Sequence, residues 1–133
     1  MNIQEQMSTV LIIDDDPVHQ RIAQLMISRN HLFDTCVSHT EAGQALKFLK
    51  NNFNNPEALP DIILLDLNMP VIDGWDFLDT YNKFREDLIK DIRIFIVTSS
   101  VDEKDKLRSQ TFSFVKGFIS KPLSPDIIRK TII

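Results

Sequence analysis

Four short apolar runs, each followed by a charged or hydroxylated residue, constrain this chain more than any other feature. The runs cover residues 10–13, 62–65, 94–97 and 117–120, and they are followed in turn by Asp14 and Asp15, Asp66, Thr98, and Lys121. Uninterrupted apolar runs of this length are typical of strands buried on both faces of a parallel sheet. Such sheets bind ligands at the carboxyl ends of their strands. We therefore expect three carboxylates, one hydroxyl and one ammonium to meet in one crevice.

The chemistry of this predicted cluster suits Mg2+ and a phosphoryl group. With strand order 2-1-3-4-5, the first and third strands are neighbours, which places Asp14 and Asp15 about 5 Å from Asp66. Two ionised carboxylates about 4.5 Å apart repel by on the order of 4 kcal/mol at an effective dielectric constant near 20. Three such groups therefore need a cation. Oxygen ligands favour Mg2+ over zinc, and the histidines and the single cysteine have no ligand spacing.

Length and composition favour one domain. The 133 residues, 43% of them hydrophobic, suffice for one compact core and are too few for two ordinary domains. We predict an N-terminal tail over residues 1–8 and a single domain over residues 9–133, with no output domain. The sequence does not decide whether this chain is part of a longer protein.

Charge and cysteine content argue against several classes of function. The net charge is −4 and the basic residues are scattered, so neither nucleic acid nor an anionic membrane surface is an expected partner. Cys36 is the only cysteine, which excludes a disulfide within the chain, and we predict that it is a small buried residue. The N-terminus lacks basic residues and the first apolar run stops at Asp14, which argues against a signal peptide or a membrane span. The expected location is the cytoplasm.

Helical patterns alternate with the apolar runs and predict strand-helix-strand units. Strands are expected near residues 10–13, 33–38, 61–65, 93–97 and 117–120. Helices are expected over residues 17–29, after Thr40, after Asp73-Gly74, from a capping box of Ser100 with Glu103, and after Ser124; Asp16 is the expected cap of the first. The predicted fold class is α/β: a doubly wound, five-stranded parallel sheet of order 2-1-3-4-5 in a flavodoxin-like three-layer sandwich.

Four motifs, in order and spacing, resemble the receiver domain of two-component response regulators, the CheY-like family. They are VLIIDDDP at residues 10–17, LLDLNMP at 64–70 with the Asp-Gly pair at 73–74, VTS at 97–99, and SKP at 120–122. Each motif alone is weak, but the four together leave little room for chance. The resemblance covers the chain from about Thr9 to its end, and it implies the same fold that the apolar runs predict.

The resemblance implies a metal site. Asp15, Asp66 and the backbone carbonyl of Asn68 would ligate Mg2+ directly, and Asp14 would act mainly through a bound water.

It also implies a phosphoryl site, in which Asp66 is the phosphoacceptor and forms an acyl phosphate. Thr98 would donate a hydrogen bond to one phosphoryl oxygen, and Lys121 would pair with another. These roles position groups and stabilise charge. The chain would therefore be a phosphoacceptor that assists its own phosphorylation and dephosphorylation, not a turnover enzyme.

A switch and two classes of partner follow from the same resemblance. The family places an aromatic residue where Phe118 stands, and its rotamer follows that of Thr98; since phenylalanine has no hydroxyl, a switch here must act by packing. A histidine kinase or phosphotransfer protein would supply the phosphoryl group, and a downstream protein would read the result. The protein is expected to be a monomer or a weak dimer. The Lys121-Pro122 bond is often cis in the family, and the sequence leaves its isomer open.

Two alternatives from other classes stay open at this point. A degenerate receiver would be a binding module independent of phosphorylation, but such domains usually lack the acceptor, the acidic pair or the lysine, and this chain has all of them. A phosphatase of the haloacid dehalogenase type also uses an aspartate at a strand end with Mg2+, but it needs a second aspartate two residues later as general acid. That position is Asn68 here.

Overall fold

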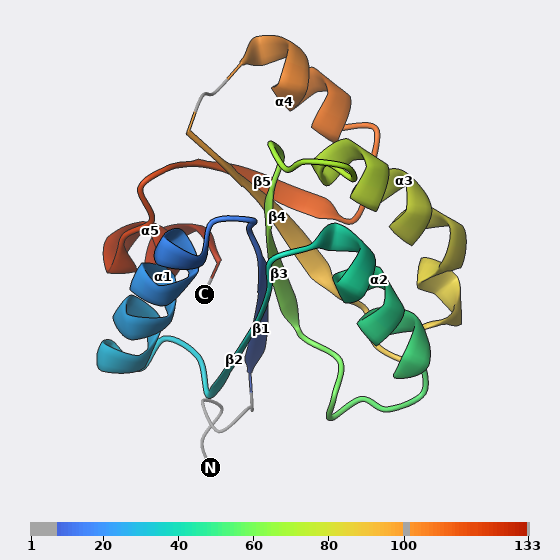
Figure 1. Cartoon of the computed structure of the whole chain (residues 1–133), viewed down its shortest axis with the longest axis horizontal. Helices are drawn as coiled ribbons and strands as arrows, with labels where there is room; N and C mark the ends of the chain where they lie inside the picture. Colours follow the sequence, from blue (N-terminus) through green and yellow to red (C-terminus); the bar gives the residue numbers. More distant parts are fainter. Residues whose placement is uncertain (1–7, 100–101, 133) are drawn as a thin grey trace.

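The structure, a computed structural model, describes residues 8–99 and 102–132, and in these residues it has one parallel sheet with helices on both faces (Figure 1). The strand order is β2-β1-β3-β4-β5, as predicted. The strands are β1 (Thr9–Ile13), β2 (Thr35–His39), β3 (Ile62–Asp66), β4 (Arg93–Thr98) and β5 (Val115–Ser120).

Helices connect the strands and form the two outer layers. They are α1 (Pro17–Arg29), α2 (Ala42–Asn51), α3 (Gly74–Phe84), the 3-10 turn η2 (Arg85–Asp87), α4 (Glu103–Ser109) and α5 (Pro125–Thr131). Helices α1 and α5 cover one face of the sheet, and α2 and α3 cover the other (Figure 1). The predicted three-layer sandwich is therefore confirmed.

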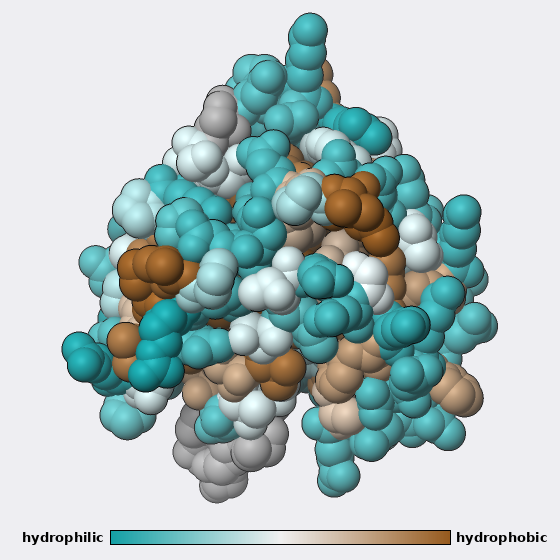
Figure 2. Space-filling model, in the orientation of Figure 1, coloured by the Kyte–Doolittle hydropathy of each residue, from teal (hydrophilic) through white to brown (hydrophobic). Residues whose placement is uncertain are grey.

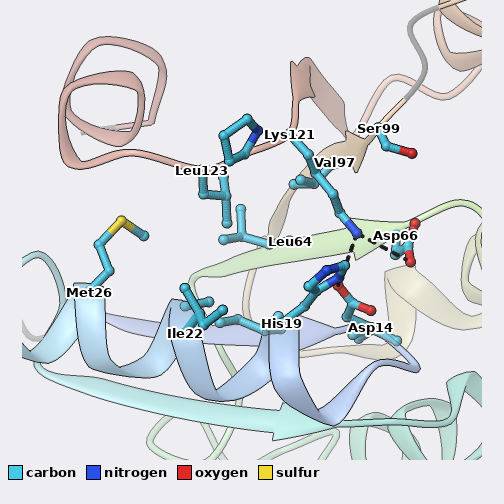
Figure 3. Close-up of a pocket in the computed structure, with 14 residues that line it drawn as sticks. Asp14, His19, Ile22, Met26, Leu64, Asp66, Val97, Ser99, Lys121 and Leu123 are labelled. Carbon is cyan, nitrogen blue, oxygen red and sulfur yellow. Dashed lines mark hydrogen bonds and ion pairs between the residues drawn. The ribbon is translucent and has the colours of Figure 1, made fainter.

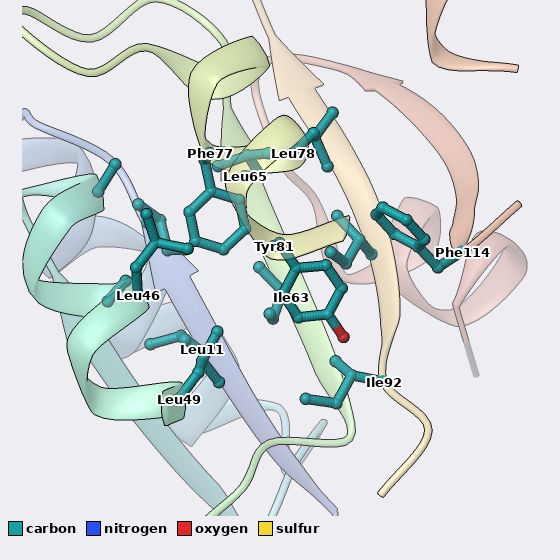
Figure 4. Packing of buried hydrophobic residues seen from close by; sticks show 14 of the residues in the cluster. Leu11, Leu46, Leu49, Ile63, Leu65, Phe77, Leu78, Tyr81, Ile92 and Phe114 are labelled. Atoms are coloured by element: carbon teal, nitrogen blue, oxygen red, sulfur yellow. The ribbon is translucent and has the colours of Figure 1, made fainter. Parts of the chain in front are cut away.

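The two faces of the sheet form two separate apolar clusters. Because successive side chains of a strand point to opposite faces, each central strand supplies both clusters. Leu11, Ile13, Ile63, Leu65, Ile94 and Ile96 pack toward α2 and α3 (Figure 4), and Val10, Ile12, Ile62, Leu64, Phe95 and Val97 pack toward α1 and α5. Burial on both faces explains why the apolar runs show no polar alternation.

The helix N-termini follow the sequence signals only in part. Asp16 and Ser124 cap α1 and α5 as predicted, accepting hydrogen bonds from the backbone amides of Val18 and Ile127 at 2.9 and 3.1 Å. The predicted capping box at Ser100 is wrong as the start of α4: the N-cap is Asp102, whose carboxylate accepts from Lys104 N at 2.9 Å, and Ser100 lies outside the described residues.

Two smaller predictions also need correction. Glu41 rather than Thr40 is the N-cap of α2, and it makes no side-chain capping bond, so the packing of this helix on β1 and β3 decides where it begins. Cys36 is only partly buried, because β2 is an edge strand and one side of it is uncovered. Burial raises the pKa of the Cys36 thiol to about 11.

The molecular surface carries no dominant apolar area in the view of Figure 2, which shows a largely hydrophilic face with small, separate apolar spots. Within residues 8–99 and 102–132, no helix combines the length and the apolar composition that crossing a membrane requires.

Gly74 brings the start of α3 against the end of β3. Its amide donates to the carbonyl of Leu67 at 3.0 Å. A Cβ atom at this position would lie 2.8 Å from the Asp66 carbonyl oxygen and 2.8 Å from the Leu67 Cα, both of them backbone atoms. Glycine is therefore required for α3 to approach the backbone that carries Asp66.

We expect Gly74→Ala to destabilise the protein by about 2 kcal/mol, because the added methyl group must displace backbone rather than a side chain. Gly43→Ala in α2 is the matched control: its Cβ would meet only the Ile72 side chain, at 3.5 Å, and alanine favours a helix over glycine. Urea unfolding of both variants measures the difference. Equal losses of stability would contradict the steric argument.

Candidate functional site

An acidic turn follows β1 at the carboxyl edge of the sheet. The backbone amide of Asp14 donates to the carbonyl of His39 at 3.2 Å, and Asp14 Oδ1 accepts from the amide of Asp16 at 3.0 Å. Asp14 is buried, whereas Asp15 is exposed. Hydrogen bonds, chiefly from the amide of Val18, hold the pKa of Asp16 below its usual value. Asp16 therefore acts as a helix cap, whereas Asp14 and Asp15 contribute to a cluster of carboxylates.

The sheet register brings Asp66 beside this turn. Ile13 pairs with Leu65, so the residues that follow, Asp14 and Asp66, leave their strands side by side. Carboxylate oxygens of Asp14, Asp15 and Asp66 all lie within 4.8 Å of one another. The structure thus brings together the three carboxylates that the sequence placed at one edge.

Lys121 lies between the buried carboxylates. Its Nζ is 3.1 Å from Asp14 Oδ2 and 3.6 Å from Asp66 Oδ2, and Figure 3 shows the side chain extending from the end of β5 toward both. The amide of Lys121 donates to the Thr98 carbonyl at 2.8 Å, which ties the end of β5 to β4. The Lys121-Pro122 peptide bond is cis.

Asp66 is buried in this cluster, and its environment disfavours the ionised form. Burial is the main reason that the pKa of Asp66 is raised, and the charges of Asp14 and Asp15 act in the same direction. The Lys121 ammonium and the Asn68 amide, which donates to Asp66 Oδ1 at 3.2 Å, oppose the shift without cancelling it. The Lys121 ammonium is therefore insufficient to offset the effect of burial on the Asp66 carboxyl.

The residues present fit a hard divalent cation. Three carboxylates that converge on one point beside a single ammonium hold an excess of negative charge, and their oxygens match the ligands of Mg2+. Asn68 is exposed, two residues after Asp66. Its carbonyl oxygen stays a predicted ligand.

Thr98 and Phe118 occupy neighbouring strands. Thr98 is the buried last residue of β4 and pairs in register with Ser120 of β5. Phe118, two residues earlier on β5, is partly buried against the cluster under α2 and α3. Their predicted roles as phosphoryl ligand and switch stay predictions.

An apolar crevice opens beside the carboxylates. It has a volume of about 460 Å3 and lies between α1 and the segment after β5, with Ile22, Ala23 and Met26 on one wall and Leu123 on the other (Figure 3). Exposed apolar side chains continue along α1, where Val18 and Ile22 are 63% and 60% exposed. A partner that reaches Asp66 can therefore contact apolar surface as well.

Two further residues of α1 lie at the site. His19 lines the crevice, with Nδ1 3.9 Å from Asp14 Oδ2 and 3.5 Å from Asp16 Oδ2. Gln20 was not named, yet it is buried beneath the acidic turn. The sequence could have indicated this burial, because Gln20 lies at helical spacing from Ala23 and Ile27 and therefore on the same buried face of the helix.

We expect Asp66→Asn to stabilise the metal-free protein at neutral pH, by about 1 kcal/mol, the usual size of a single-residue effect. The folded pKa of Asp66 is raised, so its ionised form costs stability at pH values above that pKa. The cost disappears as the pH falls toward the unfolded pKa, because the native state then binds the extra proton. Urea unfolding at several pH values measures the trend.

Asp16→Asn is the control, because the pKa of Asp16 is shifted the other way. The stability that ionised Asp16 contributes is present above the unfolded pKa and is lost as the pH falls through the folded pKa. A gain from Asp66→Asn that does not change with pH would contradict the role of burial at Asp66.

Comparisons with known proteins agree with this geometry. The family model described as "Response regulator receiver domain" matches residues 10–133. The chain is 29% identical over 123 residues to the sensor histidine kinase CheAY of Helicobacter pylori, and 30% identical over 123 residues to the two-component response regulator ORR1 of Oryza sativa subsp. japonica. The matches cover 92% and 90% of this chain, but only 14% and 52% of those relatives.

Solved structures give the same result. A two-component response regulator from Cytophaga hutchinsonii superposes with a TM-score of 0.84 at 26% identity, covering 94% of this chain and 93% of that one. The bacteriophytochrome response regulator AtBRR gives 0.77 at 28% identity, covering 96% and 91%. With a family match over nearly its whole length, the chain belongs to the receiver domain family of the response regulators of two-component signalling.

Proposed function

We propose that Asp66 is the phosphoacceptor of this receiver, and that its phosphorylation changes the affinity of the domain for a downstream protein. The observation that carries the proposal is the position of Asp66, at the end of a buried strand with two further carboxylates and one ammonium within contact distance. A histidine kinase or a phosphotransfer protein is the proposed donor. The partners of the whole protein are proposals, since this chain spans 14% and 52% of the two relatives named above.

In the proposed reaction a carboxylate oxygen of Asp66 attacks the phosphorus atom. The Asp66 Oδ–P bond forms while the bond from phosphorus to the donor nitrogen breaks, and the leaving imidazole takes up a proton from solvent. Asp15, Asp66 and the Asn68 carbonyl would hold Mg2+, with Asp14 acting through water, and the ion would supply positive charge that offsets the carboxylates and the phosphoryl oxygens. The product is an acyl phosphate.

Lys121 and Thr98 are the proposed ligands of the transferred group. The Lys121 ammonium already lies 3.6 Å from Asp66 Oδ2, so a short movement lets it pair with a phosphoryl oxygen. The Thr98 hydroxyl belongs to the strand next to β3 and would donate to another oxygen. Both groups stabilise charge and turn over no substrate, so the chain is proposed to be a phosphoacceptor without further enzymatic activity.

The competing functions have less support. A degenerate receiver would lack part of the set formed by the acidic pair, the acceptor and Lys121, and the set is complete in this chain. No finding favours the phosphatase alternative, and Asn68 cannot be its general acid. A cytoplasmic location, a single domain over residues 9–133 and a monomer or weak dimer stay predictions.

The acceptor is tested with acetyl phosphate in the presence of Mg2+. We expect intact-mass analysis to show one added phosphoryl group on the wild type, lost in hydroxylamine, and none on Asp66→Asn. Asp16→Asn is the matched control, because it changes a carboxylate of the same turn that caps α1 instead of facing the crevice. Equal labelling of wild type and Asp66→Asn would overturn the assignment.

The output is proposed to act through α4 and β5. Phosphorylation adds negative charge and acceptor oxygens that Thr98 and Lys121 can engage at the ends of β4 and β5. Helix α4 has seven residues and buries only Ser109. A small free-energy bias at the strand ends can therefore shift the position of this helix.

We expect beryllofluoride to change amide hydrogen exchange in α4 and β5 of the wild type. Phe118→Ala should reduce that change while leaving the labelling of Asp66 nearly intact, because Phe118 packs on the adjacent core and is not one of the groups proposed to bind the phosphoryl group. Ile22→Ala, an exposed change on α1, is the control. Exchange changes restricted to α1 and α2 would contradict this output face.

A further inference from the structure

Gln20 is a buried polar residue directly below the acidic turn. It lies on the inward face of α1 with 4% of its surface exposed. Its Nε2 contacts three backbone carbonyl oxygens: that of His39 at 2.8 Å, that of Asp14 at 3.0 Å and that of Ile12 at 3.3 Å. Two hydrogens serve three acceptors, so the two shorter contacts take them. Gln20 thereby joins the turn after β1 to the end of β2.

These contacts complete the attachment of Asp14. Its amide donates to His39, its two carboxylate oxygens accept from the amide of Asp16 and from Lys121 Nζ, and its carbonyl accepts from Gln20. The Gln20 bond is the one that fixes the plane of the peptide between Asp14 and Asp15. Any rotation of that peptide moves the Cα atom from which the Asp15 side chain extends.

Asp15 depends on this backbone more than its neighbours do. Among the described residues its carboxylate makes no hydrogen bond or ion pair, and the residue is exposed. A carboxylate without partners is held in place only by its own backbone and rotamer. Its oxygen still lies within 4.8 Å of those of Asp14 and Asp66, so the backbone of the turn already aims it at the common point.

The presence of glutamine at position 20 supports a role in which its side-chain NH2 group donates hydrogen bonds. Gln20 Oε1 is buried without a partner in the described part of the chain. Burying an unsatisfied acceptor is unfavourable, and methionine would fill a similar volume without that cost. Three backbone carbonyl oxygens surround this end of the Gln20 side chain, and only a hydrogen-bond donor can pair with them. The same surroundings identify the atom next to them as the amide nitrogen, not the amide oxygen.

We propose that Gln20 is a positioning residue of the metal site: by holding the Asp14 carbonyl against the end of β2, it orients Asp15 toward the point shared with Asp66. The inference rests on the Mg2+ site of the proposed function. It concerns the chain's own hydrogen bonds, which Gln20 makes to the carbonyls of His39 and Asp14.

The test compares Gln20→Met with Gln24→Met. Gln24 lies one turn later on the same helix and donates from Nε2 to Ser38 Oγ at 2.6 Å, away from the acidic turn. We expect Gln20→Met to raise the dissociation constant for Mg2+ about tenfold, as residues that orient metal ligands commonly do, and Gln24→Met to leave it unchanged. Calorimetric titration with Mg2+ gives the constants, and Asp15→Asn is the positive control. At saturating Mg2+ the phosphorylation rate of Gln20→Met should return toward that of the wild type.

A second measurement needs no variant. In NMR spectra of the wild type, the side-chain amide hydrogens of Gln20 should exchange slowly and shift on addition of Mg2+, while those of Gln24 should not shift. Equal loss of Mg2+ affinity in both methionine variants would assign the effect to general weakening of α1 and overturn the inference. Unchanged affinity in Gln20→Met, or a Gln20 amide that does not respond to Mg2+, would also overturn it. If the wild type does not bind Mg2+, the result would instead contradict the Mg2+ site of the proposed function.

Discussion

Repulsion among carboxylates at one edge of the sheet is the constraint on which the site depends. Asp14, Asp15 and Asp66 converge within 4.8 Å, and two of them are buried. The Lys121 ammonium contacts both buried groups, yet burial still raises the pKa of Asp66. Three carboxylates thus face a single ammonium, and this excess of negative charge favours binding of a cation.

The rest of the fold keeps these charges from separating. Strands β1 and β3 are buried on both faces, so their register cannot slip without moving apolar side chains out of both clusters. Gly74 lets α3 lie against the backbone of Asp66, and Gln20 binds the turn after β1 to β2. Packing in the two clusters thus supplies the free energy that holds like charges together.

The sequence predicts most of the positions of the site residues, because a single rule relates the ends of buried strands to the edge of a parallel sheet. Apolar runs without alternation indicate buried parallel strands, and the polar residues after them must share an edge; Asp14, Asp15, Asp66 and Lys121 were located in this way and lie together. Helix starts were less predictable. Ser100 with Glu103 has the pattern of a capping box, but Asp102 is an equally good cap and is the one used. Local signals that compete within two residues are decided by tertiary contacts.

The contacts that Gln20 and Gly74 make were not predicted, for a related reason. Each acts through backbone atoms of a distant segment: Gln20 on the carbonyls of Asp14 and His39, Gly74 on the backbone of Asp66 and Leu67. Backbone acceptors leave no trace in the residue types of their own segments. Only the buried position of a polar residue on α1 hints at the first contact, and only the proximity of Asp-Gly to the third apolar run hints at the second.

The same balance of charge links the resting site to its proposed switching. In the free protein the Lys121 ammonium is shared between Asp14 and Asp66. A phosphoryl group on Asp66 replaces a single negative charge with nearly two, so Lys121 gains a stronger partner and its pairing with Asp14 weakens. Because the Lys121 amide is bonded to the Thr98 carbonyl at 2.8 Å, a movement of this lysine is transmitted directly to the ends of β4 and β5. The ammonium that contacts both buried carboxylates is therefore also the group best placed to respond to the proposed phosphorylation of Asp66.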